Sequence, residues 1–400
     1  MPVTTSRVRK PRPDFPLFPH ATGRWAKKIR QKLHYFGKTT GDEKGQAALE
    51  RWLEQKDDLL AGHTPRVKAD GLTIRELANR FAGSKKNLLD AHEISARYFG
   101  EVLATCRIII GSFGPNRLVT DLASDDFANL RKSMAKLWGP VHLANMIGRI
   151  RSVFKFAHDS RLILQPVCFG PGFKKPSATV LRINRTSNGA MMFEPAELRT
   201  ILDAAGQPMR AMILLGINCG YGPSDVARLP MKALDLESGW ANFPRPKTGI
   251  PRRCPLWPET VAAVQEALAT RPVPKSRGDS GLAFLTARGR PWQRSGIIES
   301  DAPSGEVSDI RVSSASAVVD GFTKLIKRLG LHRRRRGFYG LRHGFETVAG
   351  DSRDQVAVHY VMGHSRGDMA SVYRERIDDA RLVAVVQHVR TWLFGNGETK

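Results

Sequence analysis

Apolar residues recur every three or four positions through most of the chain, which is the spacing of a helix that buries one face. Thr73 precedes one such repeat and can cap it, because its hydroxyl can accept a hydrogen bond from the first helical turn. The chain is therefore predicted to be mainly α-helical. The expected helices lie at residues 45–60, 74–81, 92–107, 141–158, 196–205, 209–219, 260–270 and 314–329, with one more beginning at Ser124.

A small antiparallel sheet interrupts this helical pattern. Its strands are predicted at residues 240–243 and 252–256, on either side of a Pro-Lys-Thr-Gly turn at 246–249. Residues 271–312 are rich in proline and glycine and are expected to form loops, with one short strand at 282–285.

Composition and charge narrow the possible partners. The chain has 400 residues, 41% of them hydrophobic, so two or three domains with real cores are expected. A formal net charge of +25 favours a polyanionic partner. A membrane surface is less favoured, because no apolar run reaches about 18 residues. Since the four cysteines are widely spaced and no signal peptide is recognised, reduced thiols and a cytoplasmic location are expected.

Residues 1–68 form a basic arm in which charges alternate with apolar side chains between positions 23 and 37. This segment fits two short strands around a turn, with aromatic residues holding a small sheet. It fits a basic amphipathic helix equally well, because Trp25, Ile29 and Leu33 recur every four residues. In either form, candidates for contact with a phosphate backbone are Arg24, Lys27, Lys28, Arg30 and Lys32.

Reactive side chains recur between residues 337 and 377 at spacings that packing alone does not require. Arg342 is followed by His364 and then, nine positions later, by Tyr373. Arginine clamps phosphate through a planar fork of donors, and histidine can donate a hydrogen bond near neutral pH. Tyrosine can attack phosphorus and be held as a covalent ester. Together these residues are suited to chemistry on a phosphodiester.

The sequences Leu341-Arg342-His343 and Gly363-His364-Ser365, with the spacing to Tyr373, resemble the C-terminal signature of the tyrosine recombinase, or phage integrase, family. The resemblance implies that Tyr373 cleaves DNA through a 3′-phosphotyrosyl intermediate while Arg342 and His364 hold the phosphate. The predicted Lys-Thr-Gly turn resembles the hairpin lysine of the family, which implies that Lys247 protonates the departing 5′ oxygen.

Two positions depart from the pattern of the family. The first catalytic arginine is expected where this chain has Gly222, and the histidine that opens the C-terminal signature is replaced by Tyr339. Tyr339 can donate one hydrogen bond to a phosphate oxygen, but it cannot become cationic at neutral pH. A missing donor of this kind costs about 2.7 to 4 kcal/mol of transition-state stabilisation. The sequence leaves several cations that could replace the arginine, among them Arg210, Arg228, Arg252 and Arg253.

The resemblance also implies a division of the chain into four parts. A basic N-terminal arm at 1–68 precedes a helical, SAM-like core-binding domain at 69–164. A helix-poor linker at 165–190, broken by prolines and glycines, leads to the catalytic domain at 191–400. The expected fold is therefore an integrase-like, DNA breaking-rejoining catalytic domain, mainly helical with a small antiparallel sheet, behind a helical bundle.

Two further segments of the catalytic domain are candidates for contacts. The cationic run that includes Arg333, Arg334 and Arg335 immediately precedes the signature and is expected to touch backbone phosphates. Apolar positions from Leu382 to Leu393 predict a final helix. Its apolar face either folds back within the chain or, as in the family, docks on a neighbouring subunit.

These observations predict a site-specific recombinase that cuts and rejoins double-stranded DNA, working as a homotetramer joined through the final helix. No metal or nucleotide is expected to be needed, because the phosphotyrosine bond conserves the energy of the broken bond. The alternative is a DNA-binding accessory protein whose catalysis is impaired by the changes at Gly222 and Tyr339.

Overall fold

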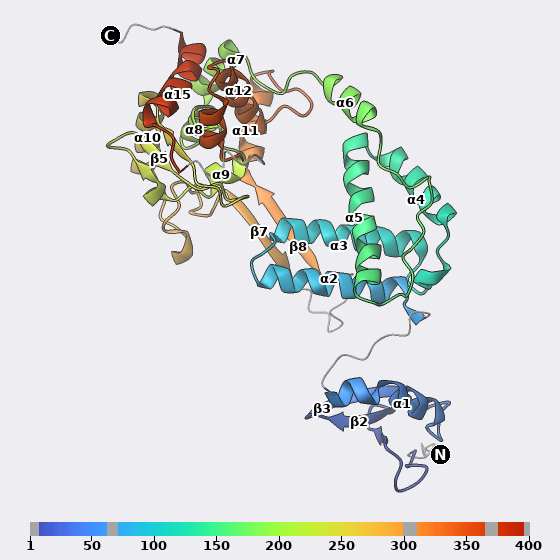
Figure 1. Ribbon diagram of the computed structural model, residues 1–400. Coiled ribbons are helices and arrows are strands. Elements are labelled where there is room, and N and C mark those ends of the chain that lie inside the picture. The colour runs from blue at the N-terminus through green and yellow to red at the C-terminus, as the bar shows by residue number, and fades with distance from the viewer. Residues whose placement is uncertain (1–7, 62–70, 299–309, 365–374, 396–400) are drawn as a thin grey trace. The chain divides into compact units, whose positions relative to one another are not determined.

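The computed structural model describes residues 8–61, 71–298, 310–364 and 375–395 (Figure 1). The chain divides into two compact units. One draws on Met1–Ser84, Thr105–Trp138 and Leu143–Lys175, and the other on Lys85–Ala104, Gly139–His142 and Pro176–Lys400. Among the described residues, no helix combines the length and the apolar content needed to span a membrane.

The arm folds as a sheet packed on a helix, so the two-strand alternative is correct and the helical one is wrong. Strands β1 (Phe18–His20), β2 (Arg24–Ile29) and β3 (Lys32–Lys38) pair antiparallel in that order, and α1 (Gln46–Ala61) follows. A turn with positive φ at Arg30 and Gln31 separates β2 from β3 and prevents a continuous helix. The core of the arm includes Trp25, Ile29, Phe36 and, from α1, Trp52.

The helical bundle contains α2 (Ile74–Asp90), α3 (Ala96–Phe113), α4 (Ser124–Leu137) and α5 (Pro140–Asp159). Thr73 caps α2 as predicted, because the backbone N–H of Glu76 donates to its hydroxyl at 3.2 Å while Glu76 accepts from the N–H of Thr73 at 2.9 Å.

Phenylalanines form the centre of the first unit. Phe127 of α4 is fully buried, and its ring lies 5.2 Å from that of Phe113 and 5.4 Å from that of Phe154. Phe169 and Phe173 join the same cluster at 4.8 and 5.4 Å. The expected linker is therefore partly packed. Its expected lack of helix is wrong in one place, since α6 covers Ala178–Thr186.

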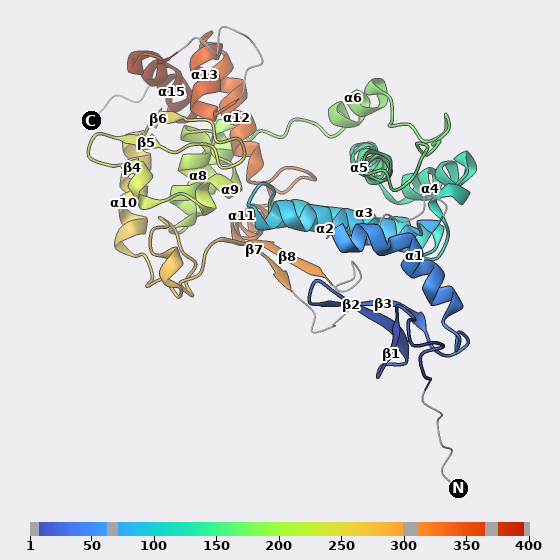
Figure 2. The same cartoon turned by 60° about the horizontal axis from the view of Figure 1, so that its bottom comes forward.

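The second unit is built around an apolar helix. Residues 211–218 of α8 (Met209–Asn218) are all buried, because a helix that is apolar on every side must be surrounded by other elements. Helices α10 (Pro258–Ala269) and α12 (Tyr339–Gly350) pack on it, and Figure 2 shows α8 in the middle of the domain. A side chain at Gly216 would meet Leu341 at 2.7 Å, so this glycine lets α12 approach α8 closely.

The remaining elements of this unit complete the fold. The predicted sheet exists as β4 (Leu234–Asp235), β5 (Trp240–Asn242) and β6 (Arg253–Pro255), paired antiparallel. Its remaining described helices are α7 (Pro195–Ala204), α9 (Pro223–Ala227), α11 (Ala317–Arg328), α13 (Gln355–Met362) and α15 (Asp379–Phe394). Short 3₁₀ turns lie at Met231–Ala233 and Arg277–Asp279 in this unit and at Val119–Asp121 in the first unit.

The predicted loop region differs from the structure. Strands β7 (Gln293–Ile298) and β8 (Arg311–Ser316) form an antiparallel pair there, and the expected strand at 282–285 makes only isolated bridges through its first and last residues. Strand β8 is mostly polar and largely exposed, so it lacks the alternation of apolar residues by which a half-buried strand is recognised.

The final helix folds back within its own chain. Leu382, Val386 and Leu393 of α15 are buried in the core of the second unit. The indole N–H of Trp257 donates to the carbonyl of Val386 at 3.0 Å, and Arg390 forms a paired hydrogen bond with Glu259 at 2.6 and 3.0 Å. Since its apolar face is already covered, docking of α15 on a neighbour would have to use its other residues.

Truncation of the aromatic centre should destabilise the first unit. Phe127→Ala removes a ring with four aromatic neighbours, and we expect a loss of about 3–5 kcal/mol in the free energy of unfolding. Hydrogen exchange of peptides from α4 and α5 would measure the loss locally. Leu137→Ala, on the same helix but with a residue that is 77% exposed, should change it by less than about 0.5 kcal/mol. Equal effects of the two substitutions would contradict this account of the core.

Candidate active site

Arg342 is a buried cation near the start of α12. Its guanidinium donates to the carbonyl of Gly220 at 2.6 Å and to the carbonyl of Met362 at 2.8 Å. These bonds join the turn after α8 to the end of α13. A buried charge is costly unless its donors are used, and the two carbonyls satisfy part of that requirement. Arg342 is thereby fixed in one orientation.

His364 lies beside Arg342 because α13 ends at a left-handed residue. Gly363 has a φ of 62°, and a Cβ there would lie 3.0 Å from the Cβ of Arg245. The guanidinium of Arg342 approaches the Nε2 atom of His364 to 2.7 Å. Because a guanidinium only donates, Nε2 must accept and the ring proton lies on Nδ1. That nitrogen faces the carboxylate of Glu346 at 3.5 Å.

The electrostatics of this pair would be relieved by a bound anion. Burial, with the charges of Arg342 and Arg245, lowers the pKa of His364 to about 4. Burial and the charge of Arg245 also lower the pKa of Arg342 to about 10. Cations held this close together repel one another unless an anion lies between them. A phosphate is such an anion.

The position of the expected first arginine is covered by an aromatic ring. A Cβ at Gly222 would lie 3.5 Å from the ring of Tyr339, and the N–H of Gly222 donates to Asp225 at 2.7 Å. Tyr339 is 49% exposed, so its side chain is accessible to a ligand. Its ring also contacts His343, with 5.4 Å between centroids.

Of the four cations named from the sequence, one is buried close to this position. Arg252 pairs with Asp225 at 3.0 Å, and its guanidinium lies 4.1 Å from the ring centre of Tyr221. Arg253 pairs instead with Asp379 at 2.8 Å and lies over Trp240. The other two, Arg210 and Arg228, are exposed.

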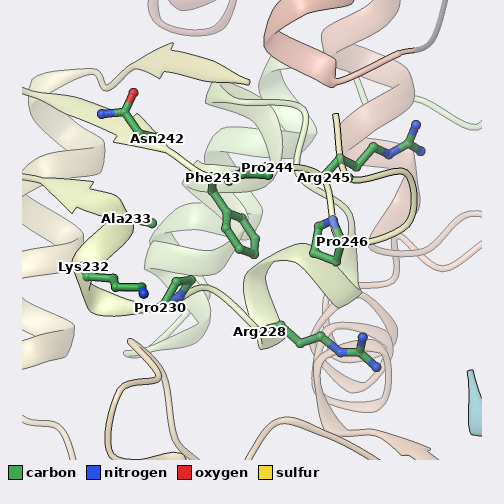
Figure 3. A pocket seen from close by; sticks show the side chains of 10 residues that line it. Arg228, Pro230, Lys232, Ala233, Asn242, Phe243, Pro244, Arg245 and Pro246 are labelled. Atoms are coloured by element: carbon green, nitrogen blue, oxygen red, sulfur yellow. The ribbon is translucent and has the colours of Figure 1, made fainter. Parts of the chain in front are cut away.

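The cation that lies against Gly363 was not among the predicted site residues. Arg245 donates from Nη1 to the carbonyl of Gly363 at 3.3 Å. Figure 3 shows its side chain extending away from Phe243, at the edge of a cavity of about 500 Å³ beside the hairpin. In the sequence Arg245 is one more cation before a turn, and nothing there indicates a partner 118 positions away.

Lys247 lies on the turn that Arg245 begins. The N–H groups of Thr248 and Gly249 donate to the carbonyl of Arg245 at 3.1 and 2.8 Å, and Gly249 has the positive φ that closes the turn. Lys247 is exposed, and its side chain has no hydrogen bond or ion pair with another described residue. Tyr373 and Ser365 lie outside the described residues, so the predicted nucleophile has no structural account.

A metal ion could be held beside His364 on distance alone. Glu346, His359 and His364 each offer a ligand atom, and these atoms lie within 4.8 Å of one another. The charges of Arg342 and Arg245 that lower the pKa of His364 also oppose a second cation there. The arrangement therefore suits an anion better than a metal.

The other predicted contact residues lie on the arm and in the cationic run. Arg24, Lys28 and Lys32 are exposed on the sheet of the arm, and Arg30 is exposed in the turn between β2 and β3. Lys27 is part-buried and donates to the carbonyl of Pro16 at 2.9 Å. In the cationic run, Arg333, Arg334 and Arg335 are all exposed, and Arg333 lies 3.9 Å from Glu197.

Comparison with known proteins relates this domain to a protein family. The model of the phage integrase family matches residues 192–379. The integrase of transposon Tn1549, solved with circular intermediate DNA, is 16% identical, with a TM-score of 0.54 over 79% of this chain and 99% of that chain. A lambda integrase dimer bound to a COC′ core site is 15% identical, with a TM-score of 0.53 over 92% and 98%. No curated protein matches the sequence.

These findings confirm the predicted fold class, a mainly helical integrase fold with small antiparallel sheets. The fold and the matched domain are those of tyrosine recombinases. Residues 192–379 are a domain of the phage integrase family.

The low pKa of His364 can be tested by titration. We expect its ring to stay neutral from pH 8 down to about pH 5, because its pKa lies near 4 rather than at the ordinary 6.5. Arg245→Ala removes a repelling charge and should raise the midpoint. NMR of the histidine ring carbons, assigned with His364→Gln, measures both values. A midpoint above 6 in the unchanged protein would contradict the described geometry.

Proposed function

We propose that the protein is a site-specific recombinase that cleaves and rejoins double-stranded DNA through a 3′-phosphotyrosyl bond to Tyr373. The observation that supports this most is the buried Arg342 held 2.7 Å from His364, inside a domain that matches the phage integrase family. Both side chains belong to the signature from which the chemistry was predicted. The solved relatives in complex with DNA support double-stranded DNA as the substrate class.

In this mechanism Arg342 and His364 bind the non-bridging oxygens of the scissile phosphate. The oxygen of Tyr373 attacks phosphorus and the phenolic proton passes to water. The bond between phosphorus and the 5′ oxygen breaks, and Lys247 gives that oxygen a proton. The 3′ phosphate remains attached to Tyr373 until a 5′ hydroxyl attacks it in the reverse reaction. The ester bond is exchanged rather than hydrolysed, so the reaction needs no other energy source.

His364 must change its hydrogen bonding for this role. In the free protein its Nε2 accepts from Arg342, so it has no proton there to offer. A phosphate that binds Arg342 would release Nε2, and the negative charge would favour a proton on it. Tyr339, whose ring lies next to Gly222, is proposed to donate a hydrogen bond to a phosphate oxygen in place of the histidine of the family.

The proposed contacts with DNA extend beyond the catalytic pocket. The exposed cations on the sheet of the arm and the exposed arginines before α12 are proposed to bind backbone phosphates. Assembly into a tetramer on DNA is proposed by analogy with a lambda integrase tetramer bound to a Holliday junction. The final helix α15 is proposed to join the subunits through residues other than those of its buried apolar face.

Covalent trapping tests the proposal. On a nicked suicide substrate, the fragment after the cleavage site diffuses away and the protein should accumulate as a covalent DNA adduct. Tyr373→Phe should form none, because the attacking oxygen is gone. Denaturing gel electrophoresis with labelled DNA measures the adduct. DNA binding without any adduct would instead support the alternative, an accessory protein with impaired catalysis.

Replacement of the 5′ leaving oxygen by sulfur tests whether Lys247 is the general acid. Lys247→Ala should slow adduct formation by about 10²–10⁴-fold, since it removes the proton donor. A substrate with sulfur in place of the 5′ bridging oxygen needs no proton donor, so it should restore most of the rate. Thr248→Ala, on the same turn, serves as the control. If sulfur does not restore the rate, Lys247 is not the general acid.

A further inference from the structure

The absence of a side chain at Gly222 leaves a chemical requirement unmet. During the proposed transfer, negative charge accumulates on two non-bridging oxygens, and a single arginine fork must otherwise balance it. The aromatic ring of Tyr339 covers the position of Gly222, and a phenol supplies no positive charge at neutral pH. A second cation must therefore reach the phosphate from another part of the fold.

Two arginines converge on Gly363, next to His364. A Cβ at that glycine would lie 3.0 Å from Arg245 and 3.3 Å from Arg252. The charges of both lower the pKa of Arg342, and that of Arg245 has the larger effect. Arg245 also lowers the pKa of His364, so its charge acts on both proposed phosphate ligands.

Arg252 is held in a structural role. Its Nε donates to the carbonyl of Phe243 at 2.6 Å, and Nη2 pairs with Asp225. The side chain is fully buried between the rings of Tyr221 and Phe243. Moving it to a ligand would leave the carboxylate of Asp225 buried without its partner, which is costly.

Arg245 is free to turn toward a ligand. It is only half-buried, and its hydrogen bond to Gly363 is 3.3 Å long. Its backbone is nevertheless fixed, because its N–H donates to Ile250 at 2.9 Å and its carbonyl accepts two bonds from the turn. The guanidinium therefore has a rigid base and a weak existing contact.

We propose that Arg245 takes the place of the missing first arginine and supplies the second cationic contact to the scissile phosphate. This inference rests on the proposed recombinase function and deepens it. Arg245 and Lys247 belong to one turn, so the same hairpin would deliver a charge to the non-bridging oxygens and a proton to the leaving oxygen. The sequence Arg-Pro-Lys then acts as one unit at the phosphate.

A methylphosphonate substrate, which is uncharged at the scissile group, distinguishes stabilisation of charge by Arg245 from a structural effect of its loss. We would measure single-turnover adduct formation at saturating protein, on a phosphodiester and on a methylphosphonate that lacks one anionic oxygen. Arg245→Ala should slow the phosphodiester reaction by about 10²–10³-fold. On the methylphosphonate the defect should largely disappear, because less negative charge develops there. Arg245→Lys should fall between the two on the phosphodiester.

Arg228→Ala is the matched control, because it removes an exposed arginine near the same hairpin. It should leave both rates nearly unchanged. The thermal unfolding midpoint should be unaffected in Arg245→Ala but lowered in Arg252→Ala, which leaves the buried Asp225 without its charged partner. The inference is overturned if Arg245→Ala behaves like Arg228→Ala, or if it slows both substrates equally. Absence of an adduct from the unchanged protein would overturn the proposed function itself.

Discussion

The arrangement of the second unit around its candidate site depends on how one buried guanidinium is satisfied. Arg342 donates to carbonyls at the end of two other segments, the turn after α8 and the last turn of α13. Those carbonyls can accept from Arg342 because α8 and α13 end there, and carbonyls at the end of a helix have no partner within it. The contact therefore couples three elements that are far apart in the sequence, and it leaves His364 as the adjustable partner. A ligand that draws on Arg342 must change the surroundings of His364 as well.

Positive charge near this guanidinium comes from a hairpin rather than from the turn after α8. Gly222 and Tyr339 stand at the two positions where the sequence is expected to depart from the family. In the structure they are neighbours, since a Cβ at Gly222 would lie 3.5 Å from the ring of Tyr339. Asp225 accepts from Gly222 and pairs with Arg252, so its carboxylate is used within the protein. The two positions thus belong to one local arrangement, in which an aromatic ring lies against Gly222 and arginines from the hairpin bring the charge.

Much of this organisation could be predicted from the sequence, and the failures have physical causes. The periodicity of apolar residues located the helices, and the capping role of Thr73 was correct because N-caps depend on local bonds. Arg342 and His364, both taken from the signature, lie 2.7 Å apart in the structure. Periodicity could not decide between strand and helix near Trp25, where a turn at Arg30 settles the matter. Arg245 escaped notice because its significance arises from contact with Gly363, which only the complete fold creates.

The anchoring of α15 has a consequence for how the second unit holds together. Arg381 forms two hydrogen bonds of 2.7 Å with Asp354, so the first turn of α15 is fastened to the beginning of α13. The carboxylate of Asp354 also accepts from the N–H of Ala357 at 3.1 Å and so caps α13. One carboxylate therefore serves the first turns of both helices, and its loss would loosen both together.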